Sequence, residues 1–542
     1  MIALAATSFS APKIEYGDLS PILILLGVAT LGILLEVVVP RPLRFVTQAG
    51  VAAAGVVGAI GATIAVWTVL DPGAHHPKPG KVLAEGAFAL DGPSLVGWSL
   101  ILLLAFLGVL LFAERRLEGG VSGFSGQAAT VPGTGAERES AGLEHGEIFP
   151  LLMFSVAGML MFVAANDLIV AFVSLEIISL PLYLLCALAR RRRLLSQEAA
   201  MKYFLLGAFS SGFFVYGMAL TYGFAGSMGY AQIAAAIQGR AGAHALLLGG
   251  MGLLAVGLFF KIGAVPFHGW VPDVYQGAPT ALTGFMAAAT KVAAFCALLR
   301  LFYVAFGGAR WDWEPMFWVI AIATMVIGAV LALSQRDVKR LLAYSSIAHA
   351  GFLLVGLLGA RALADTTGQI QPVQAVLFYL TSYGLMTMAA FAIVTLVRNE
   401  SGEATSFASW RGIGKQSPLV AGLFAFLLLA MAGVPLTAGF TGKWAVFTAA
   451  LAAGSWQLMV IAVFASAVAL GFYIRVIVVM FFSDPHIEVE EGVARQEAAT
   501  AVTIASPLTS AVIGLGVLAT LYLGVMPGQF LDLLGRVGTF VR

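Results

Sequence analysis

The sequence predicts an all-α polytopic membrane protein with about fourteen transmembrane helices, two inverted five-helix repeats and two discontinuous helices. Apolar residues (Ala, Val, Ile, Leu, Met, Phe, Trp, Tyr and Cys) make up 60% of its 542 residues, and charged residues only 11%, whereas an average soluble domain has about 25% charged residues. This composition excludes a soluble globule. Fourteen apolar runs approach or exceed the roughly 20 residues that cross the hydrocarbon layer as a helix. They lie at 19–39, 45–70, 91–113, 148–166, 167–189, 199–225, 243–270, 278–304, 314–334, 340–360, 372–397, 418–450, 456–482 and 505–531.

The basic residues predict how these spans are oriented. Sixteen of the 30 Lys and Arg residues, including the run at 190–193, fall on the side of the odd-numbered loops, and eight fall on the side of the termini. Because Lys and Arg are enriched in cytoplasmic loops, we expect both termini on the outer face. Residues 1–18 lack the basic start of a signal peptide, so the first run is expected to be a span. The loop at 114–147, rich in Gly, Ser and Glu, is expected to be cytoplasmic and disordered.

Several classes of function are excluded. The net charge of +2 is too small, and the basic residues too scattered, for nucleic-acid binding. Cys186 and Cys296 both lie in apolar runs, which argues against a disulfide framework or a cysteine-ligated cluster. The chain has no dinucleotide fingerprint after a strand, no P-loop and no metal-ligand spacing. We therefore expect it to bind no cofactor or metal and to perform no redox chemistry alone.

Ionisable residues inside the apolar runs are the candidates for function. Such a side chain costs about 2.5 to 3.5 kcal/mol on insertion scales, so it usually faces the bundle interior and marks an ion or proton route. Lys202 is close to a span end and could instead snorkel to water. Lys291 lies about 13 residues, or about 20 Å, into its span, which is too deep for that. The basic residues inside spans are Lys202, Lys261, Lys291, Arg300, Lys443 and Arg475, of which the two arginines could simply tie helices together.

A buried pair between Glu176 and Lys261 is predicted. Glu176 sits at the centre of the fifth span, and at about 4 Å from a lysine its carboxylate would gain on the order of 4 kcal/mol at an effective dielectric near 20. Burial disfavours the charged form of a lysine and a nearby carboxylate favours it. Moving the two groups together or apart would therefore switch proton affinity. An inert buried ion pair is the structural alternative.

Two spans carry helix-breaking residues beside a lysine. Gly263 and Pro266 follow a lysine in the seventh span, and Gly433 and Pro435 precede Lys443 in the twelfth. Glycine weakens a helix and proline removes a backbone hydrogen bond, so both spans are expected to unwind inside the membrane. Unwound backbone is tolerated there only where it is buried in protein or lines a wet cavity. A mere kink is the alternative.

The two prolines also indicate an internal repeat. Pro266 and Pro435 are 169 residues apart, and this offset places spans 4, 5, 6 and 8 on spans 9, 10, 11 and 13. Each repeat has five spans, an odd number, so the second repeat is inverted relative to the first. The expected segments are 1–113 with helices 1–3, the loop 114–147, repeat one at 148–306, repeat two at 307–482, and 483–542 with a loop and helix 14.

Four segments resemble the antiporter-like membrane subunits of respiratory complex I (NADH:quinone oxidoreductase), and most closely the subunit N family. They read SLEIISLPLY at 174–183, FFKIGAVPFHGWVPDVYQGAPT at 259–280, SQRDVKRLLAYSSIAHAG at 334–351 and GVPLTAGFTGKW at 433–444. The resemblance implies proton pumping coupled to quinone reduction elsewhere in a complex of a bacterial cell membrane. NADH, FMN, iron–sulfur clusters and the quinone would be bound by other subunits. The implied partners are further membrane subunits, including other antiporter-like ones, and a peripheral redox arm.

The resemblance also implies proton-translocation roles for seven residues. Glu176 looks like the helix 5 glutamate, and the lysines at 261, 291 and 443 like those of helices 7, 8 and 12. Lys202, His268 and His349 stand at matching positions, although a satisfied buried histidine is the alternative for both histidines. Lys443 argues against one paralogue, which has glutamate there, and the end of the chain soon after the fourteenth span argues against another with a long lateral helix.

Two other functions stay open. A subunit of a monovalent cation/proton antiporter would keep the same lysines and need no redox partner. A scaffold would use the buried charges only to hold helices together. Lys443 favours proton pumping over sodium exchange, because a lysine repels sodium, and the number of buried lysines disfavours the scaffold.

Overall fold

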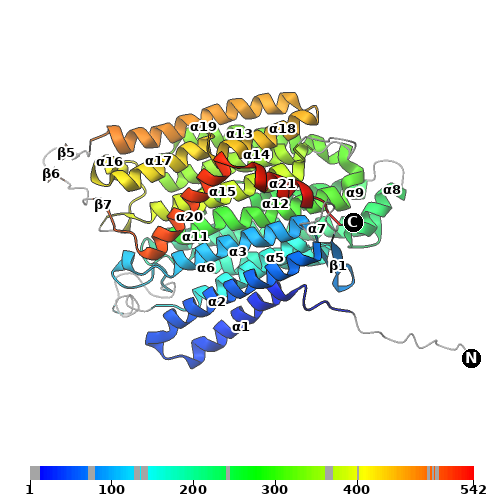
Figure 1. Cartoon of the computed structure of the whole chain (residues 1–542), viewed down its shortest axis with the longest axis horizontal. Coiled ribbons are helices and arrows are strands. Elements are labelled where there is room, and N and C mark those ends of the chain that lie inside the picture. Colours follow the sequence, from blue (N-terminus) through cyan, green and yellow to red (C-terminus); the bar gives the residue numbers. More distant parts are fainter. Residues whose placement is uncertain are drawn as a thin grey trace, which may run out of the picture.

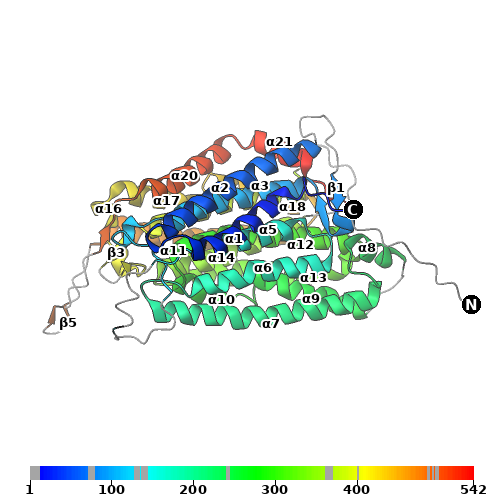
Figure 2. The ribbon, with the colours of Figure 1, turned by 90° about the horizontal axis from the view of Figure 1, so that it is seen from below.

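A computed structural model describes residues 13–70, 80–126, 135, 144–239, 245–359, 370–399, 402–484, 489–490, 493–494 and 500–541. Long helices running along one common direction make up most of it (Figures 1 and 2). Among the described residues, twelve helices are long and apolar enough to cross a membrane, or thirteen if one bent pair counts as a span. The predicted class, a mostly helical multi-pass membrane protein, is therefore confirmed.

The helices follow the apolar runs closely. Their bounds are α1 Ser20–Val38, α2 Arg41–Trp67, α3 Gly92–Phe112, α5 Ile148–Ala164, α6 Leu168–Cys186, α7 Arg193–Ala225, α8 Tyr230–Gly239, α9 Ala245–Ile262, α10 Trp270–Gly277, α11 Thr280–Phe285, α12 Lys291–Arg300, α13 Arg310–Ser334, α14 Val338–Leu358, α15 Pro372–Val394, α16 Ile413–Gln416, α17 Pro418–Ala432, α18 Ala438–Ala452, α19 Trp456–Phe482, α20 Pro507–Val525 and α21 Gly528–Val537.

The count of continuous spans differs from fourteen at two places. The run predicted at 148–166 forms α5, whose 17 residues are short for a span. The run predicted at 418–450 is divided between α17 and α18, and α17 is bent by 116° against the preceding short helical segment. Apolar composition alone predicts neither the short α5 nor the division between α17 and α18, because it does not show where a helix ends.

Polar residues just before several helices explain where those helices begin. Asp91 accepts a hydrogen bond from Ser94 N at the start of α3, and Asp167 accepts one from Ile169 N at the start of α6. Asp337 and Ser506 cap α14 and α20 in the same way. Such caps satisfy backbone N–H groups that have no partner inside the helix.

The most deeply buried helix of the bundle contains irregular turns. A π-helical turn, Met286–Thr290, joins α11 to α12, and a second one, Leu301–Ala305, follows α12. Together these elements form one continuous helical segment, Thr280–Ala305, whose apolar part is wholly buried. Helices α14 and α15 are nearly as buried, whereas in the apolar parts of α1, α2, α7, α19 and α20 only about a third of the residues or fewer are buried. Figure 2 shows α7 along one long edge of the bundle and α20 near the opposite edge.

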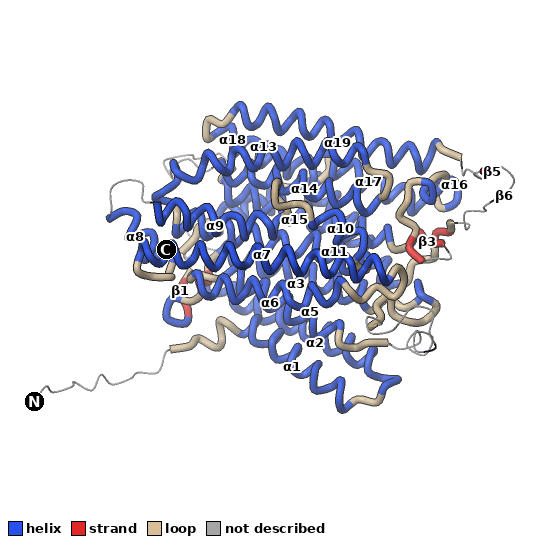
Figure 3. Tube along the Cα trace, turned by 180° about the vertical axis from the view of Figure 1, so that it is seen from behind, coloured by secondary structure: helices blue, strands red, loops and turns tan. Residues whose placement is uncertain are grey.

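In the part of the chain that the structure describes, short strands lie only at the ends of the helices, as Figure 3 shows. Strands β1 (Lys81–Leu83) and β2 (Phe88–Leu90) pair antiparallel near the C-terminus, at the end where both described chain ends lie (Figure 1). At the opposite end, β3 (Val397–Asn399) pairs antiparallel with β4 (Gly402–Glu403) and with β7 (Ala501–Val502). Two further short strands, β5 (Val489–Glu490) and β6 (Val493–Ala494), also pair antiparallel.

The two glycine–proline segments coincide with helix ends. Helix α9 ends at Ile262, before Gly263 at φ +74°, and α10 begins at Trp270. Helix α17 ends before Gly433 at φ +93°, and α18 begins at Ala438. A glycine with positive φ directly after a helix is a common C-terminal cap. Gly263 and Gly433 each take this role.

The described flanks of the 114–147 loop are packed. Arg115 pairs with Glu144 through two hydrogen bonds of 2.9 and 2.8 Å, and the ring of Phe124 packs on that of Phe112. The expectation of disorder does not hold for these flanks. Residues 127–134 and 136–143 lie outside the described residues.

Candidate functional site

Glu176 and Lys261 do not form the direct pair that the sequence predicts. Lys261 Nζ donates to Ser179 Oγ at 2.8 Å and to Tyr203 OH at 3.4 Å, and lies 5.7 Å from the centre of the Tyr203 ring. Glu176 Oε1 accepts a hydrogen bond from Ser211 Oγ at 2.5 Å. Within the described ranges no ion pair joins the two charges. The predicted contact is therefore wrong for this structure, because hydroxyl groups on α6 and α7 occupy the positions of the expected partners.

Lys291 follows the first π-helical turn and is almost completely buried, with 3% of its surface exposed. Its Nζ donates to the backbone carbonyl of Ser346 on α14 and lies 5.8 Å from the centre of the Tyr383 ring. Tyr383 OH donates to Ser346 Oγ at 2.9 Å. Turns of π-helix are frequent at functional sites, and this one ends at the residue directly before Lys291.

Lys443 caps the helix that the glycine–proline segment ends. Its Nζ donates to Ala432 O, the carbonyl of the last residue of α17, at 2.8 Å and to Ser466 Oγ on α19 at 2.8 Å. The ring of Phe352 lies 4.9 Å from Nζ. A Cβ added to Gly433 would lie 3.1 Å from Lys443 Cδ. The break and the lysine thus form one local structure, as their proximity in the sequence suggests.

His349 links α14 to two other helices through tyrosines. Its Nδ1 is 2.7 Å from Tyr379 OH on α15, and its Nε2 is 3.1 Å from Tyr473 OH on α19. Tyr473 OH is also hydrogen-bonded to Ser345 Oγ. Neither tyrosine stands out in the sequence, although a buried Tyr hydroxyl usually needs a partner.

Lys202 and His268 lie apart from this group. Lys202 Nζ pairs with Asp273 and with Glu198, each at 2.8 Å, and 42% of its side chain is exposed. Asp273 also pairs with Arg340 at 2.7 Å. His268 lies between α9 and α10, and no hydrogen bond in the described part of the chain joins it to a buried lysine. The snorkelling interpretation therefore fits Lys202 better than a place beside the buried lysines.

Arg300 has a close carboxylate partner, which Lys261, Lys291 and Lys443 lack in the described part of the chain. Its Nη2 lies 2.6 Å from Asp91 Oδ1 and donates to Ser94 Oγ at 2.7 Å, and both charged side chains are completely buried. Val541 N donates to the other Asp91 oxygen at 3.0 Å, and the Phe540 ring packs over the guanidinium at 4.9 Å. This is the structural tie between helices that the sequence suggests for Arg300. Asp91 does not stand out in the sequence, because it lies at the end of a predicted span.

No group of three or more His, Cys, Asp or Glu that could hold a metal is present in the ranges that the structure describes.

Comparisons with known proteins agree with the resemblance read from the motifs. Residues 165–469 match the family described as NADH:quinone oxidoreductase/Mrp antiporter, TM. Curated relatives named NADH-quinone oxidoreductase subunit N include one from Nocardioides sp., 59% identical over 98% of this chain and 100% of that protein. Another is subunit N 3 from Streptomyces griseus, 51% identical over 100% of this chain and 97% of that protein.

Solved structures are similar over almost the whole chain. A chain of respiratory complex I from Thermus thermophilus with bound aureothin has a TM-score of 0.71 and 33% identity, covering 94% of this chain and 98% of that one. A chain of the Mrp complex from Dietzia sp. has a TM-score of 0.74 at 22% identity, covering 96% and 97%, a level that supports the fold alone. The chain belongs to the NADH-quinone oxidoreductase subunit N family, within the wider group of NADH:quinone oxidoreductase and Mrp antiporter membrane subunits.

Proposed function

We propose that this chain is a proton-translocating membrane subunit of a proton-pumping NADH:quinone oxidoreductase. It couples quinone reduction in other subunits to proton transfer among its buried Glu, Lys and His residues. High identity to curated subunits N over nearly the full length supports this assignment. The chain is catalytic only as part of the complex.

The observation that carries the proposal is the set of partners around Lys261, Lys291 and Lys443. Each side chain is at least 96% buried, and in the described part of the chain each Nζ binds only neutral oxygen atoms, namely hydroxyls and backbone carbonyls. A buried charge that serves structure is normally paired, as Arg300 is with Asp91. Unpaired buried lysines are expected of groups that gain and lose protons.

These groups suggest an order of transfer. Glu176 and Lys261 act in the first repeat and move between a separated and a paired arrangement. The structure has the separated one, in which each charge binds hydroxyl groups. Exchange between the two arrangements changes the proton affinity of Lys261. Lys291 receives the proton and passes it toward Lys443. His349, with Tyr379 and Tyr473 on its two ring nitrogens, supplies hydrogen-bonding groups between them.

The helix breaks are assigned to two discontinuous membrane-spanning elements. In this proposal α9 with α10 forms helix 7, and α17 with α18 forms helix 12. Because α9 is already among the twelve long apolar helices, adding helix 12 and α5 gives fourteen spans. Helices 4–8 at 148–306 and helices 9–13 at 307–482 form the inverted repeats, flanked by helices 1–3 at 1–113, the loop 114–147 and helix 14 at 483–542. The described chain ends lie at one end of the bundle (Figure 1), which agrees with an even number of crossings. The distribution of Lys and Arg among the loops supports our proposal that this end faces the outside of a bacterial cell membrane.

The partners follow from the same assignment. Other membrane subunits, including further antiporter-like ones, and a peripheral redox arm complete the complex in the lipid bilayer. NADH, FMN, iron–sulfur clusters and quinone are bound in those other subunits, and this chain binds no cofactor.

Isolation of the chain tests the proposal against its runner-up, a subunit of a monovalent cation/proton antiporter. An affinity-tagged chain solubilised in mild detergent should co-purify with the other membrane subunits and with NADH-oxidising activity. Reconstituted alone, it should exchange no sodium for protons across liposomes. A chain that purifies alone and carries out that exchange would replace the proposal with the antiporter.

A further inference from the structure

A small charged cavity lies at the end of the bundle opposite the chain termini. It has a volume of about 70 Å³, which leaves room for a few water molecules. Its cations include Arg190, Arg191, Arg192 and Arg398. Half of the Arg191 side chain is exposed, so the rim of the cavity reaches solvent.

Two of the carboxylates around this cavity already have close partners. Glu118 binds Arg191 at 2.9 Å and also Arg398. Glu114 accepts hydrogen bonds from the hydroxyls of Ser506 and Thr509. These contacts tie the end of α3 to the β3–β4 hairpin and to α20, which is a structural role.

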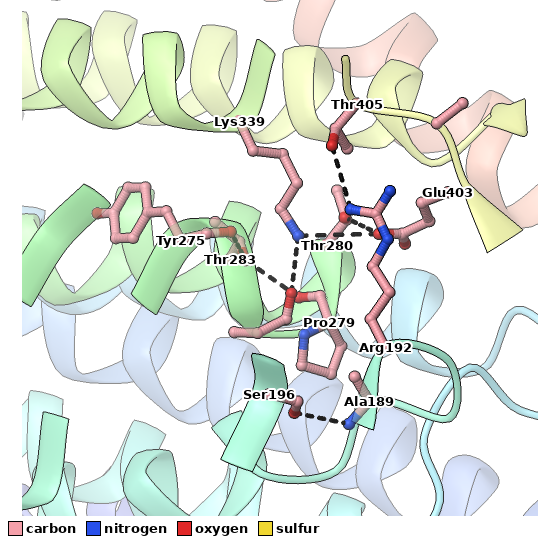
Figure 4. Close-up of polar contacts among 12 residues, drawn as sticks. Ala189, Arg192, Ser196, Tyr275, Pro279, Thr280, Thr283, Lys339, Glu403 and Thr405 are labelled. Carbon is pink, nitrogen blue, oxygen red and sulfur yellow. Dashed lines mark hydrogen bonds and ion pairs between the residues drawn. The ribbon is translucent and has the colours of Figure 1, made fainter. Parts of the chain in front are cut away.

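The inner wall holds a different pair, Lys339 and Glu403. Lys339 is only 1% exposed, and its Nζ donates to Ala278 O at 2.7 Å. The nearest Glu403 oxygen is 3.8 Å from Nζ, beyond the usual hydrogen-bond length of about 2.7 to 3.2 Å. Glu403 instead accepts a hydrogen bond from the Thr280 hydroxyl. Figure 4 shows Lys339 and Glu403 reaching from separate elements toward Thr280.

Lys339 is also connected to the buried lysines. Ala278, its hydrogen-bond acceptor, lies two residues before the helical segment that carries Lys291. Ser346, whose carbonyl binds Lys291, lies seven residues after Lys339 on α14. Residues seven apart share one face of a helix and lie about 10 Å apart along its axis. The same face of α14 therefore presents Lys339 to the cavity and Ser346 to Lys291.

We infer that Lys339 and Glu403 form a proton-loading pair between the charged cavity and Lys291. A hydronium ion in the cavity gives its proton to the Lys339 amine, which leaves water and an ammonium ion held by Ala278 O and Glu403. On transfer inward one N–H bond of this ammonium breaks and an N–H bond forms on the neutral Lys291 amine, so that Lys339 is again an amine and Lys291 becomes the ammonium ion. Only N–H and O–H bonds form or break. This inference rests on the proposed function and adds two residues to it.

The test uses the intact complex in inverted membrane vesicles, where this face meets the buffer. Lys339→Arg keeps the positive charge but holds its proton at any accessible pH. The variant should assemble, and its initial rate of quinone-coupled acidification should fall about threefold or more per assembled complex. Lys415→Gln is the matched control, because Lys415 forms an exposed pair with Asp484 and should pump like wild type.

A pH profile separates proton loading from a structural salt bridge. The groups that act on Lys339 are Glu403, Asp337, Arg192 and Cys186. Glu403→Gln removes only the nearest negative charge and keeps an oxygen for the Thr280 hydroxyl. Because a nearby carboxylate favours the charged lysine, the pH optimum of pumping should move about one unit or more to the acidic side.

The outcomes also distinguish this inference from the proposed function. Wild-type pumping by Lys339→Arg, or an unchanged pH profile for Glu403→Gln, would overturn the loading pair. The proposed function would still stand if Lys291→Arg fails to pump. Wild-type pumping by Lys291→Arg would overturn the proposed function itself. If Lys339→Arg does not assemble, the pH profile of Glu403→Gln decides.

Discussion

Replacing Arg300 by methionine should destabilise the protein far more than it changes pumping per assembled complex. The change keeps most of the side-chain volume but removes the guanidinium that contacts Asp91 at 2.6 Å and Ser94 at 2.7 Å. Removing one partner of a buried pair leaves an uncompensated buried charge, at a cost of about 3 to 5 kcal/mol. The complete burial of both side chains puts this site within that range.

The measurements are the amount of assembled complex on a native gel and the thermal inactivation temperature of quinone reductase activity. Arg300→Met should lower both, and Asp91→Asn with Arg300→Met should recover part of the loss, because no buried charge then remains unpaired. Arg475→Met is the matched control, since Arg475 donates to the Leu333 carbonyl and forms no ion pair in the described part of the chain. If Arg300→Met were as stable as wild type, the contrast between paired structural charges and unpaired functional lysines would lose its basis.

Three further predictions concern the buried lysines. Lys291→Arg and Lys443→Arg should assemble normally yet lower acidification by inverted vesicles, because arginine keeps its proton. The loss should be larger for Lys291→Arg. Wild-type pumping by both variants would favour the scaffold function. Glu176→Ala and Lys261→Ala should each impair pumping, and the double variant should be less damaged than the two losses combined predict, whereas strict additivity would show that the two residues act independently. Gly433→Ala places a Cβ at φ +93° and 3.1 Å from Lys443 Cδ. It should lower stability by about 1 to 2 kcal/mol, measured by thermal inactivation, and should slow pumping, measured by acidification. An alanine variant equal to wild type in both measurements would contradict the proposed link between this helix end and Lys443.

The sequence predicted those features that depend on neighbouring residues in the chain, namely the helices, one helix end and the burial of three lysines. Apolar runs predicted the helices, and Gly433 beside Lys443 predicted a helix end next to a lysine, because the glycine and the lysine are close in the chain. The burial of the lysines followed from their position inside the runs. These features need no knowledge of which helices are neighbours.

The partners of the buried groups could not be predicted in the same way. Ser179 and Tyr203 surround Lys261, and they come from helices whose rotation is set by packing. Electrostatic attraction predicted Glu176 as the partner of Lys261, because the sequence does not show which hydroxyl groups lie near the lysine. The irregular turn at Met286–Thr290 has no marker residue such as proline. Lys339 falls in the loop between the predicted spans 314–334 and 340–360, yet it lies in the first turn of α14 and is only 1% exposed.

The central position of the Thr280–Ala305 segment affects how the protein responds to its lipid surroundings. Its 26 residues would extend about 39 Å at 1.5 Å per residue, longer than a hydrocarbon layer of about 30 Å. Because the apolar part of this segment is wholly buried in protein, its length need not match the bilayer thickness. Hydrophobic mismatch and annular lipids act first on the exposed helices α1, α2, α7 and α19. Lys291 is therefore insulated from changes in membrane thickness that tilt the periphery of the bundle.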